Sequence, residues 1–288
     1  MNKKISVFDV ILITVLTILC VVTIYPVAYV LFGSLSDPLL LEHQKGILWK
    51  PLGFSLEAYK LVLHNPSIAT GYRNTLFYVF SGTIINMTMT IFGAFALTRK
   101  DLYIKKFVLL VIIFTMQFGG GLIPTYIVVN KLLGETIWTQ MLPGAIATAN
   151  LIIMRTGFMA IPESLEESAK MDGASDWSIL TNIVLPLSKP TLAVIALYYG
   201  VAHWNQWFQA SVYLRDRNLF PLQLFLREIL LQNQVEETVV GVAAGLTANM
   251  EDVVKYATVM VAIVPVLCVY PFLQKYFVKG VMVGAVKG

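Results

Sequence analysis

Acidic and small residues are concentrated in a polar segment, residues 161–186, of an otherwise apolar chain. The segment has one basic residue, Lys170, and five carboxylates: Glu163, Glu166, Glu167, Asp172 and Asp176. A helix that lies on anionic lipid usually presents Lys and Arg instead. Acidic side chains beside small ones suit insertion into a groove on a basic protein, so the predicted chemistry of the segment is docking. Its small residues include Ser168, Ala169, Gly173 and Ala174.

The order of residues in this segment predicts two short helices joined by a turn. Pro162 suits the first turn of a helix because its backbone dihedral is preset. Gly173 then allows the chain to reverse, and Ser175 can cap the second helix. On the first helix Glu166 and Lys170 are expected to pair on the solvent side, since they lie four residues apart. The apolar side of the second helix is expected to carry Trp177, Ile179 and Leu180.

Aromatic and amide residues form a second cluster, which could contact a solute. Aromatic faces stack on sugar rings, and amides hydrogen-bond to hydroxyl groups. The cluster consists of Tyr198, Tyr199, His203, Trp204, Asn205, Gln206, Trp207 and Phe208. Tyr199, His203 and Gln206 share one helical face, and a polar stripe at membrane depth is costly unless it meets water or protein. We therefore expect these three residues, with Trp204 and Asn205, to line a translocation pathway.

Other roles are open for part of this cluster. Trp207 and Phe208 fit an aromatic belt at the membrane interface better than a pathway, because Trp and Tyr gather at that depth. His203 could relay protons or form packing hydrogen bonds. We favour packing, because the uncharged windows of the chain contain no acidic partner for it.

Three glycines interrupt an apolar run that begins at Phe107. Gly119, Gly120, Gly121 and the following Pro124 all disfavour helix, and each glycine costs about 1 kcal/mol in a helix interior. A break at membrane depth is tolerated only beside protein or water. We expect a helix that breaks beside the pathway, with Gly120 and Gly121 among the pathway residues. A plain packing notch is the alternative.

The elements that must hold these residues are membrane-spanning helices. The chain of 288 residues is 57% hydrophobic and 13% charged, with a mean hydropathy of +0.72, whereas soluble domains carry roughly 25% charged residues. Its apolar windows predict six spans, each long enough for the roughly 17 to 25 residues that a crossing helix needs. The predicted spans are approximately residues 8–34, 74–98, 107–131, 136–156, 187–214 and 256–277. We expect a single all-α integral membrane domain over residues 1–288.

Short loops decide the predicted orientation, because Lys and Arg resist translocation. The loop 99–106 contains four basic residues, whereas the equally short loop 131–135 contains only Lys131. The first of these loops is therefore expected in the cytoplasm, and an even number of spans puts both termini and the segment 161–186 there too. The first span is too long for a signal-peptide core of about 7–15 residues, so we expect it to remain as a helix.

The spacing within the polar segment resembles the EAA loop of ABC importer permeases. The matching residues are Glu167-Ser168-Ala169, Asp172-Gly173-Ala174 and Ile183-Val184-Leu185-Pro186. Similarity to maltose-type carbohydrate-uptake permeases extends to FGGGLIPTY, WNQWF and the C-terminal KYFVKGVMVGAVKG. Glu167, Ala169, Asp172 and Gly173 occupy the main motif positions, and Ser168 stands where alanine is usual. The ATPase-coupling residues that follow are Glu167, Ser168, Ala169, Asp172, Gly173, Ala174 and Trp177.

This resemblance implies a type I ABC importer permease fold and a set of partners. They are a homologous second permease, an ABC ATPase dimer and an extracellular binding protein that delivers an oligosaccharide. ATP and Mg²⁺ would bind the ATPase, and this chain itself would hold no cofactor, metal or nucleic acid. It lacks the phosphate-binding pattern GxxxxGK[ST], so we expect a transport subunit and not an enzyme. The implied location is the bacterial plasma membrane.

Other functions make different demands on the sequence. A membrane-embedded enzyme would need catalytic carboxylates or metal ligands at membrane depth, where His203 is the single candidate. An ion-coupled transporter would need intramembrane acids and inverted repeats, and the sequence has neither. A permease for a peptide or another non-sugar solute, and a scaffold without transport, remain open.

Overall fold

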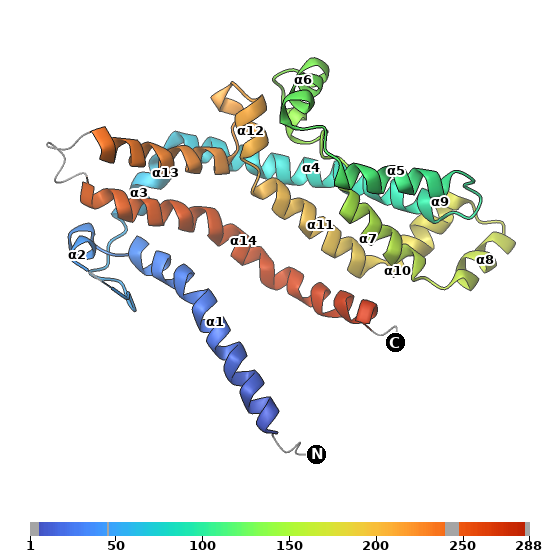
Figure 1. The fold of residues 1–288 in the computed structure, drawn as a ribbon, viewed down its shortest axis with the longest axis horizontal. Coiled ribbons are helices and arrows are strands. Elements are labelled where there is room, and N and C mark those ends of the chain that lie inside the picture. Colours follow the sequence, from blue (N-terminus) through green and yellow to red (C-terminus); the bar gives the residue numbers. More distant parts are fainter. Residues whose placement is uncertain (1–5, 45, 240–247, 286–288) are drawn as a thin grey trace. The chain divides into compact units, whose positions relative to one another are not determined.

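The computed structural model describes residues 6–44, 46–239 and 248–285. All named secondary-structure elements within these residues are helices (Figure 1). An isolated antiparallel bridge joins Ser36 to Phe54. The chain forms two compact units, residues 1–69 with 226–265 and residues 70–225 with 266–288. The predicted all-α class is confirmed for the described residues.

The first unit contains α1 (Val7–Ser34), α2 (Pro38–Glu42), α3 (Glu57–His64) and parts of α13 (Leu222–Val239) and α14 (Ala248–Ala285). Ser6 caps α1, and the carboxylate of Asp9 accepts a hydrogen bond from the Ser6 N–H at 2.9 Å, which satisfies donors that a helix start leaves free. Most of α1 is exposed around its circumference, as a lipid-facing span would be. Near its C-terminal end α14 comes close, because a Cβ at Gly33 would lie 2.7 Å from the Tyr256 ring.

The second unit carries the candidate site residues. Its elements are α4 (Pro66–Thr98), α5 (Lys105–Gln117), α6 (Leu122–Leu133), η1 (Ile137–Gln140), α7 (Thr148–Met159), α8 (Glu163–Met171), α9 (Asp176–Ile179), η2 (Leu180–Val184), α10 (Leu185–Leu187), α11 (Lys189–Trp204), α12 (Phe208–Tyr213) and η3 (Arg217–Leu219). Helices α4, α7 and α11 pack together (Figure 1). Their shared core, with residues of α9 and η2, consists of Ala94, Leu97, Leu151, Met154, Phe158, Ile179, Leu180, Val184, Ile195 and Tyr199.

Two of the described helices, α1 and α4, are each long and apolar enough to cross a membrane alone. Two further pairs meet that test only as bent pairs, α5 with α6 at 115° and α9–α10 with α11 at 83°. The predicted span 256–277 lies inside the continuous helix α14. Length and composition thus support two to four crossings among the described residues, and the count of six stays a prediction.

The predicted break at the three glycines is confirmed. Helix α5 ends at Gln117 and α6 begins at Leu122. Gly121 between them has φ +81°, a left-handed conformation that side chains with a Cβ disfavour. The glycines therefore allow the chain to turn by 115° within four residues.

Two predicted spans differ from the observed helices. The span 187–214 is wrong as one helix, because α11 ends at Trp204 and the chain restarts in α12. The Asn205 side chain donates to the Val201 carbonyl at 3.0 Å, which caps α11 in place of another turn. The span 136–156 is also not one helix. It consists of the 3₁₀ turn η1, a bend through Pro143-Gly144 and α7, and proline and glycine both interrupt helices.

A helix also lies between the predicted spans 187–214 and 256–277. Helix α13 covers Leu222–Val239, and several side chains of its N-terminal half are buried. The charged residues in this stretch ruled out a membrane span, but they do not prevent a helix outside the hydrocarbon core.

Candidate coupling loop and polar pocket

The polar segment forms the two short helices that its residues predict. Helix α8 ends at Met171, and Gly173 turns the chain with φ +80°. The Ser175 hydroxyl caps α9 by accepting from the Ser178 N–H at 3.3 Å. Pro162 precedes the first turn of α8 instead of belonging to it, a shift of one residue.

The expected pairing of Glu166 with Lys170 is wrong. The Glu166 carboxylate binds the guanidinium of Arg99, with Nη1–Oε2 at 2.8 Å and Nη2–Oε1 at 3.0 Å. Glu166 therefore faces protein and not solvent. A planar guanidinium offers two parallel donors to one carboxylate, which a lysine on the same helix cannot match.

The predicted apolar side of the second short helix is wrong for Trp177. Ile179 and Leu180 are buried in the core, but the Trp177 side chain is 63% exposed. Residues two apart on a helix point in nearly opposite directions, so Trp177 cannot share the face of Ile179. Its ring lies 6.1 Å from that of Phe92 and leaves most of its surface accessible.

The predicted coupling residues divide into two groups. Ala169 and Ala174 are half-buried and pack against the core, so they support the loop. The others are exposed: Glu167, Ser168, Asp172, Gly173 and Trp177. These exposed residues include two carboxylates and one large aromatic ring, on and beside the turn between α8 and α9.

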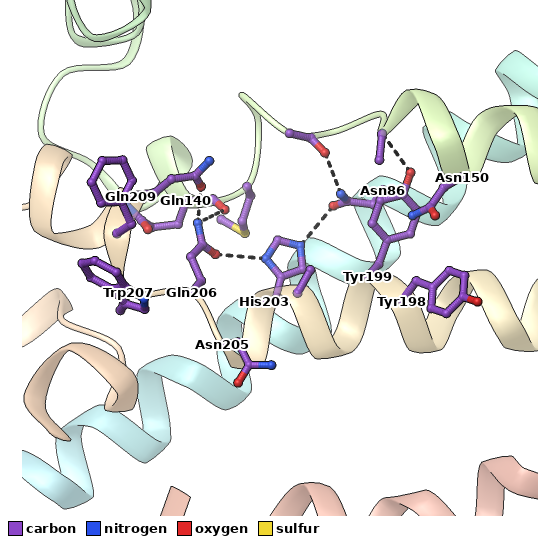
Figure 2. A pocket seen from close by; sticks show the side chains of 15 residues that line it. Asn86, Gln140, Asn150, Tyr198, Tyr199, His203, Asn205, Gln206, Trp207 and Gln209 are labelled. Carbon is purple, nitrogen blue, oxygen red and sulfur yellow. Dashed lines mark hydrogen bonds between the residues drawn. The ribbon is translucent and has the colours of Figure 1, made fainter. Parts of the chain in front are cut away.

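A polar pocket of about 310 Å³ lies between α4, α7, α11 and the bend that follows η1 (Figure 2). The pocket lining contains no charged residue among the described ones. Its polar members are Asn86, Gln140, Asn150, Tyr198, Tyr199, His203, Asn205, Gln206, Trp207 and Gln209. The remaining lining residues are Met141, Gly144, Ala147, Ala202 and Phe208.

Hydrogen bonds join the buried side of this pocket into one network (Figure 2). Asn86 donates to the Gly144 carbonyl at 2.9 Å and contacts His203 Nε2 at 3.2 Å. The other ring nitrogen of His203 lies 3.2 Å from Gln206 Oε1. The Gln206 side chain in turn donates through Nε2 to the main-chain carbonyl of Gln140 at 3.0 Å. The network therefore connects α4 to α11 and to the end of η1.

Tyr199 makes a second connection beside the network. Its hydroxyl shares a hydrogen bond of 2.7 Å with Thr90 of α4 and accepts from the Ala147 N–H at 3.0 Å. Tyr199 and His203 are both buried. For His203 the geometry agrees with the favoured interpretation of hydrogen-bonded packing.

One buried acceptor in the pocket has no hydrogen-bond partner within the described part of the chain. Gln140 is 2% exposed and donates through Nε2 to Thr139 Oγ1 at 3.0 Å. Its Oε1 atom is buried and unpaired among those residues. A buried acceptor left without a donor costs about 1–3 kcal/mol. The atom has almost no accessible surface, so a donor in the pocket could reach it only after neighbouring side chains move.

The structure brings four of the seven predicted pathway residues to this pocket: Tyr199, His203, Asn205 and Gln206. Trp204 does not line it and instead lies near Tyr72, with ring centroids 6.2 Å apart. Gly120 and Gly121 are exposed at the break between α5 and α6, away from the lining. These three residues do not line this pocket because neighbours in sequence point to different sides of a helix or a turn, and their place on a pathway stays a prediction.

Asn86, Gln140, Asn150 and Gln209 belong to the pocket but were not predicted. The sequence contains a signal for all four, because each is an amide inside an uncharged apolar window, where a polar group is costly unless paired. Trp207 and Phe208, which fitted an interfacial belt better, line the pocket as well.

Comparison with known proteins identifies relatives of this chain. Two proteins of Bacillus subtilis (strain 168) are similar over nearly the whole length. Protein LplC is 38% identical, covering 100% of this chain and 97% of its own. The polygalacturonan/rhamnogalacturonan transport system permease protein YtcP is 37% identical, covering 98% of each.

A solved structure is similar in both sequence and fold. A chain in the crystal structure of a bacterial ABC transporter involved in the import of the acidic polysaccharide alginate is 32% identical, with a TM-score of 0.83, covering 94% of this chain and 96% of its own. The type I ABC permease fold is therefore confirmed for this chain. Residues 67–283 match one family model. The chain thus belongs to the binding-protein-dependent transport system inner membrane components.

Proposed function

We propose that this chain is the permease subunit of an ATP-driven importer that takes up an oligosaccharide delivered by an extracellular binding protein. A homologous second permease completes the pathway. A separate ATPase dimer, which binds ATP and Mg²⁺, docks on the loop formed by α8 and α9. The observation that carries this proposal is the pair of exposed carboxylates, Glu167 and Asp172, on that loop in a chain of this family.

The docking step is supported by charge and shape. Glu167 in α8 and Asp172 just after its last residue are exposed, and Trp177 on α9 adds exposed apolar area. Aromatic anchors ringed by polar groups are the usual centre of a protein interface. The proposed partner surface is a groove with basic residues.

The class of solute is supported by the pocket. Its lining combines amides and aromatic rings without a charged group among the described residues, which suits a hydroxyl-rich ligand. The unpaired Gln140 Oε1 would accept from one hydroxyl. The relative YtcP is named for polygalacturonan and rhamnogalacturonan transport, and we propose an oligosaccharide for this chain as well.

The membrane arrangement in this proposal has six crossings with both termini in the cytoplasm of a bacterium. Each bent pair would form one crossing, η1 with α7 would form another, and α14 would form the last. The basic loop after α4 and the coupling loop would both face the cytoplasm.

The docking proposal is tested by co-purification. The chain is co-expressed with the ATPase and second permease of its source organism, and the amount of bound ATPase is measured. Charge reversal at Glu167 and Asp172 should lower the retained ATPase at least about tenfold, because paired interface charges contribute more than 1.4 kcal/mol together. Gly173→Pro should do the same, since proline cannot adopt φ +80°.

Glu57→Lys is the matched control, because Glu57 is an exposed carboxylate on α3 in the other unit. It should leave ATPase retention unchanged. Retention of the ATPase by the Glu167 and Asp172 variants would contradict docking at this loop. Docking without any ATP-dependent uptake would instead favour a scaffold, and uptake of a peptide would favour a non-sugar importer.

A further inference from the structure

We propose that Arg99 is a positioning residue that ties the coupling helix α8 to the end of α4, so that the docking face and the pocket-lining helix move as one body. This inference rests on the proposed docking function. Arg99 directly follows α4, which ends at Thr98. Its guanidinium meets both oxygens of Glu166 on α8, at 2.8 and 3.0 Å. Such a two-pronged contact restrains orientation as well as distance.

The guanidinium of Arg99 is held in place from several sides before α8 is considered. Its central carbon lies 4.1 Å above the centroid of the Phe95 ring, and Nη2 donates to Thr98 Oγ1 at 3.2 Å. Its main-chain carbonyl accepts from Lys105 Nζ at 3.1 Å. A cation stacked on an aromatic face and already hydrogen-bonded loses little freedom when it binds a carboxylate.

Burial distinguishes this pair from the neighbouring ion pair. The side chains of Arg99 and Glu166 are 16% and 19% exposed. Those of Lys100 and Glu163, joined at 2.6 Å, are 71% and 62% exposed. Exposed pairs contribute little and are screened by salt, whereas a partly buried pair is costly to break from one side. The Lys100–Glu163 pair is therefore an internal control on the same two elements.

The same end of α4 has a second attachment. Arg155 of α7 donates through Nε to the Leu97 carbonyl at 3.2 Å, which satisfies a group that a helix end leaves free. Asp176 of α9 also lies 4.0 Å from Arg99 Nη1. The end of α4 thus touches α7, α8 and α9 through two arginines.

The position of Glu166 explains how α8 can contact both α4 and a docked ATPase. Glu166 faces inward to Arg99, while the adjacent Glu167 is exposed. Helix α4 continues from Arg99 back to Thr90 and Asn86, which bind Tyr199 and His203 at the pocket. A displacement of α8 is therefore transmitted along α4 to the pocket, as long as the Arg99–Glu166 contact is intact.

The test uses the complex of this chain with its second permease and ATPase. Amide hydrogen exchange of α8 is measured in Arg99→Gln, in Glu166→Gln and in the exchanged pair Arg99→Glu with Glu166→Arg. Each single variant should speed exchange in α8 about tenfold, and the exchanged pair should restore most of the protection. Arg99→Lys keeps the charge but loses the two parallel donors of the guanidinium, so its exchange rate in α8 should be intermediate. This variant also covers the case in which a neutral variant does not fold.

A second measurement separates coupling from simple stability. Spin labels at Ser164→Cys on α8 and Phe80→Cys on α4, with Cys20 and Cys268 replaced by alanine, report the distance between the two helices. In the otherwise unchanged chain, ATP with vanadate should not alter this distance, because both helices move together. In Arg99→Gln the nucleotide should shift it, because α8 then moves without α4.

Several results would overturn the inference. One is wild-type exchange and distances in both single variants. Another is an equal effect from the control variants Lys100→Gln and Glu163→Gln. Failure of the ATPase to bind the unaltered chain would overturn the docking function instead, and the exchange measurements on the permease would still decide the role of Arg99.

Discussion

At the scale of residues, the pocket depends on pairing amides with each other and on leaving one acceptor free. The two ring nitrogens of His203 lie 3.2 Å from the side-chain oxygens of Asn86 and Gln206, and a neutral ring donates to one of them. Gln140 Oε1 does not have such a partner among the described residues, although Gln140 is buried. A buried acceptor of this kind lowers stability and is retained where a ligand supplies the donor.

Gln140→Leu tests this residue. The change removes the unpaired acceptor, so thermal stability in detergent should stay the same or rise, while the KM for oligosaccharide uptake should rise roughly tenfold through loss of one hydrogen bond. Uptake kinetics and an unfolding curve measure the two effects.

Thr88→Val is the control for Gln140→Leu, because Thr88 is exposed on α4 and bonds only to the Ile84 carbonyl of its own helix. It should change neither quantity. A Gln140→Leu variant that loses stability and keeps its KM would show that the side chain serves packing alone.

At the scale of elements, close helix packing holds the pocket together. Gly157 lets α7 approach α11, since a Cβ there would lie 2.7 Å from Thr191 Oγ1. Small residues at such crossings allow the backbones to come near each other in membrane proteins. Gly82 has a similar place on α4, where a Cβ would lie 2.5 Å from His203 Nε2.

Gly157→Ala should therefore destabilise the chain by about 1–3 kcal/mol, the usual cost of overpacking. Thr191→Ala in the same chain should recover most of the loss, because it removes the two atoms nearest to the new methyl group. Thermal unfolding of the single and double variants measures this coupling. Equal stability of the single and the double variant would argue against contact between Gly157 of α7 and Thr191 of α11.

At the scale of the whole molecule, the proposed topology puts the coupling loop and the basic loop 99–106 on one side. Ion pairs between them, Arg99 with Glu166 and Lys100 with Glu163, require this. The hydrogen bond to Glu163 raises the pKa of the Lys100 ammonium, so the ammonium keeps its charge until the pH rises through that raised value.

Cysteine labelling in whole cells tests the topology. Single cysteines are placed at exposed sites of a chain in which Cys20 and Cys268 are alanine. Tyr103→Cys and Ser164→Cys should react with an impermeant maleimide only after permeabilisation. Trp49→Cys and Leu132→Cys should react in intact cells, because the loops that carry them are predicted outside. Labelling of Ser164→Cys in intact cells would rule out docking on a cytoplasmic ATPase.

The sequence by itself determined the features that depend on local chemistry. Gly173 and Ser175 predict the turn and the cap of the coupling loop, the glycines at 119–121 predict the break between α5 and α6, and charge-free windows predict membrane helices. Each of these follows from backbone freedom or from the cost of charge in lipid, which act within a few residues.

Only the tertiary structure decided which side chains meet. Glu166 selects Arg99, which lies 67 positions away, over Lys170 on its own helix. Asn86 joins His203 across 117 positions, and Trp204 turns away from the pocket that its neighbours line. Pairing of this kind depends on how helices pack against each other, and spacing along one helix does not contain that information.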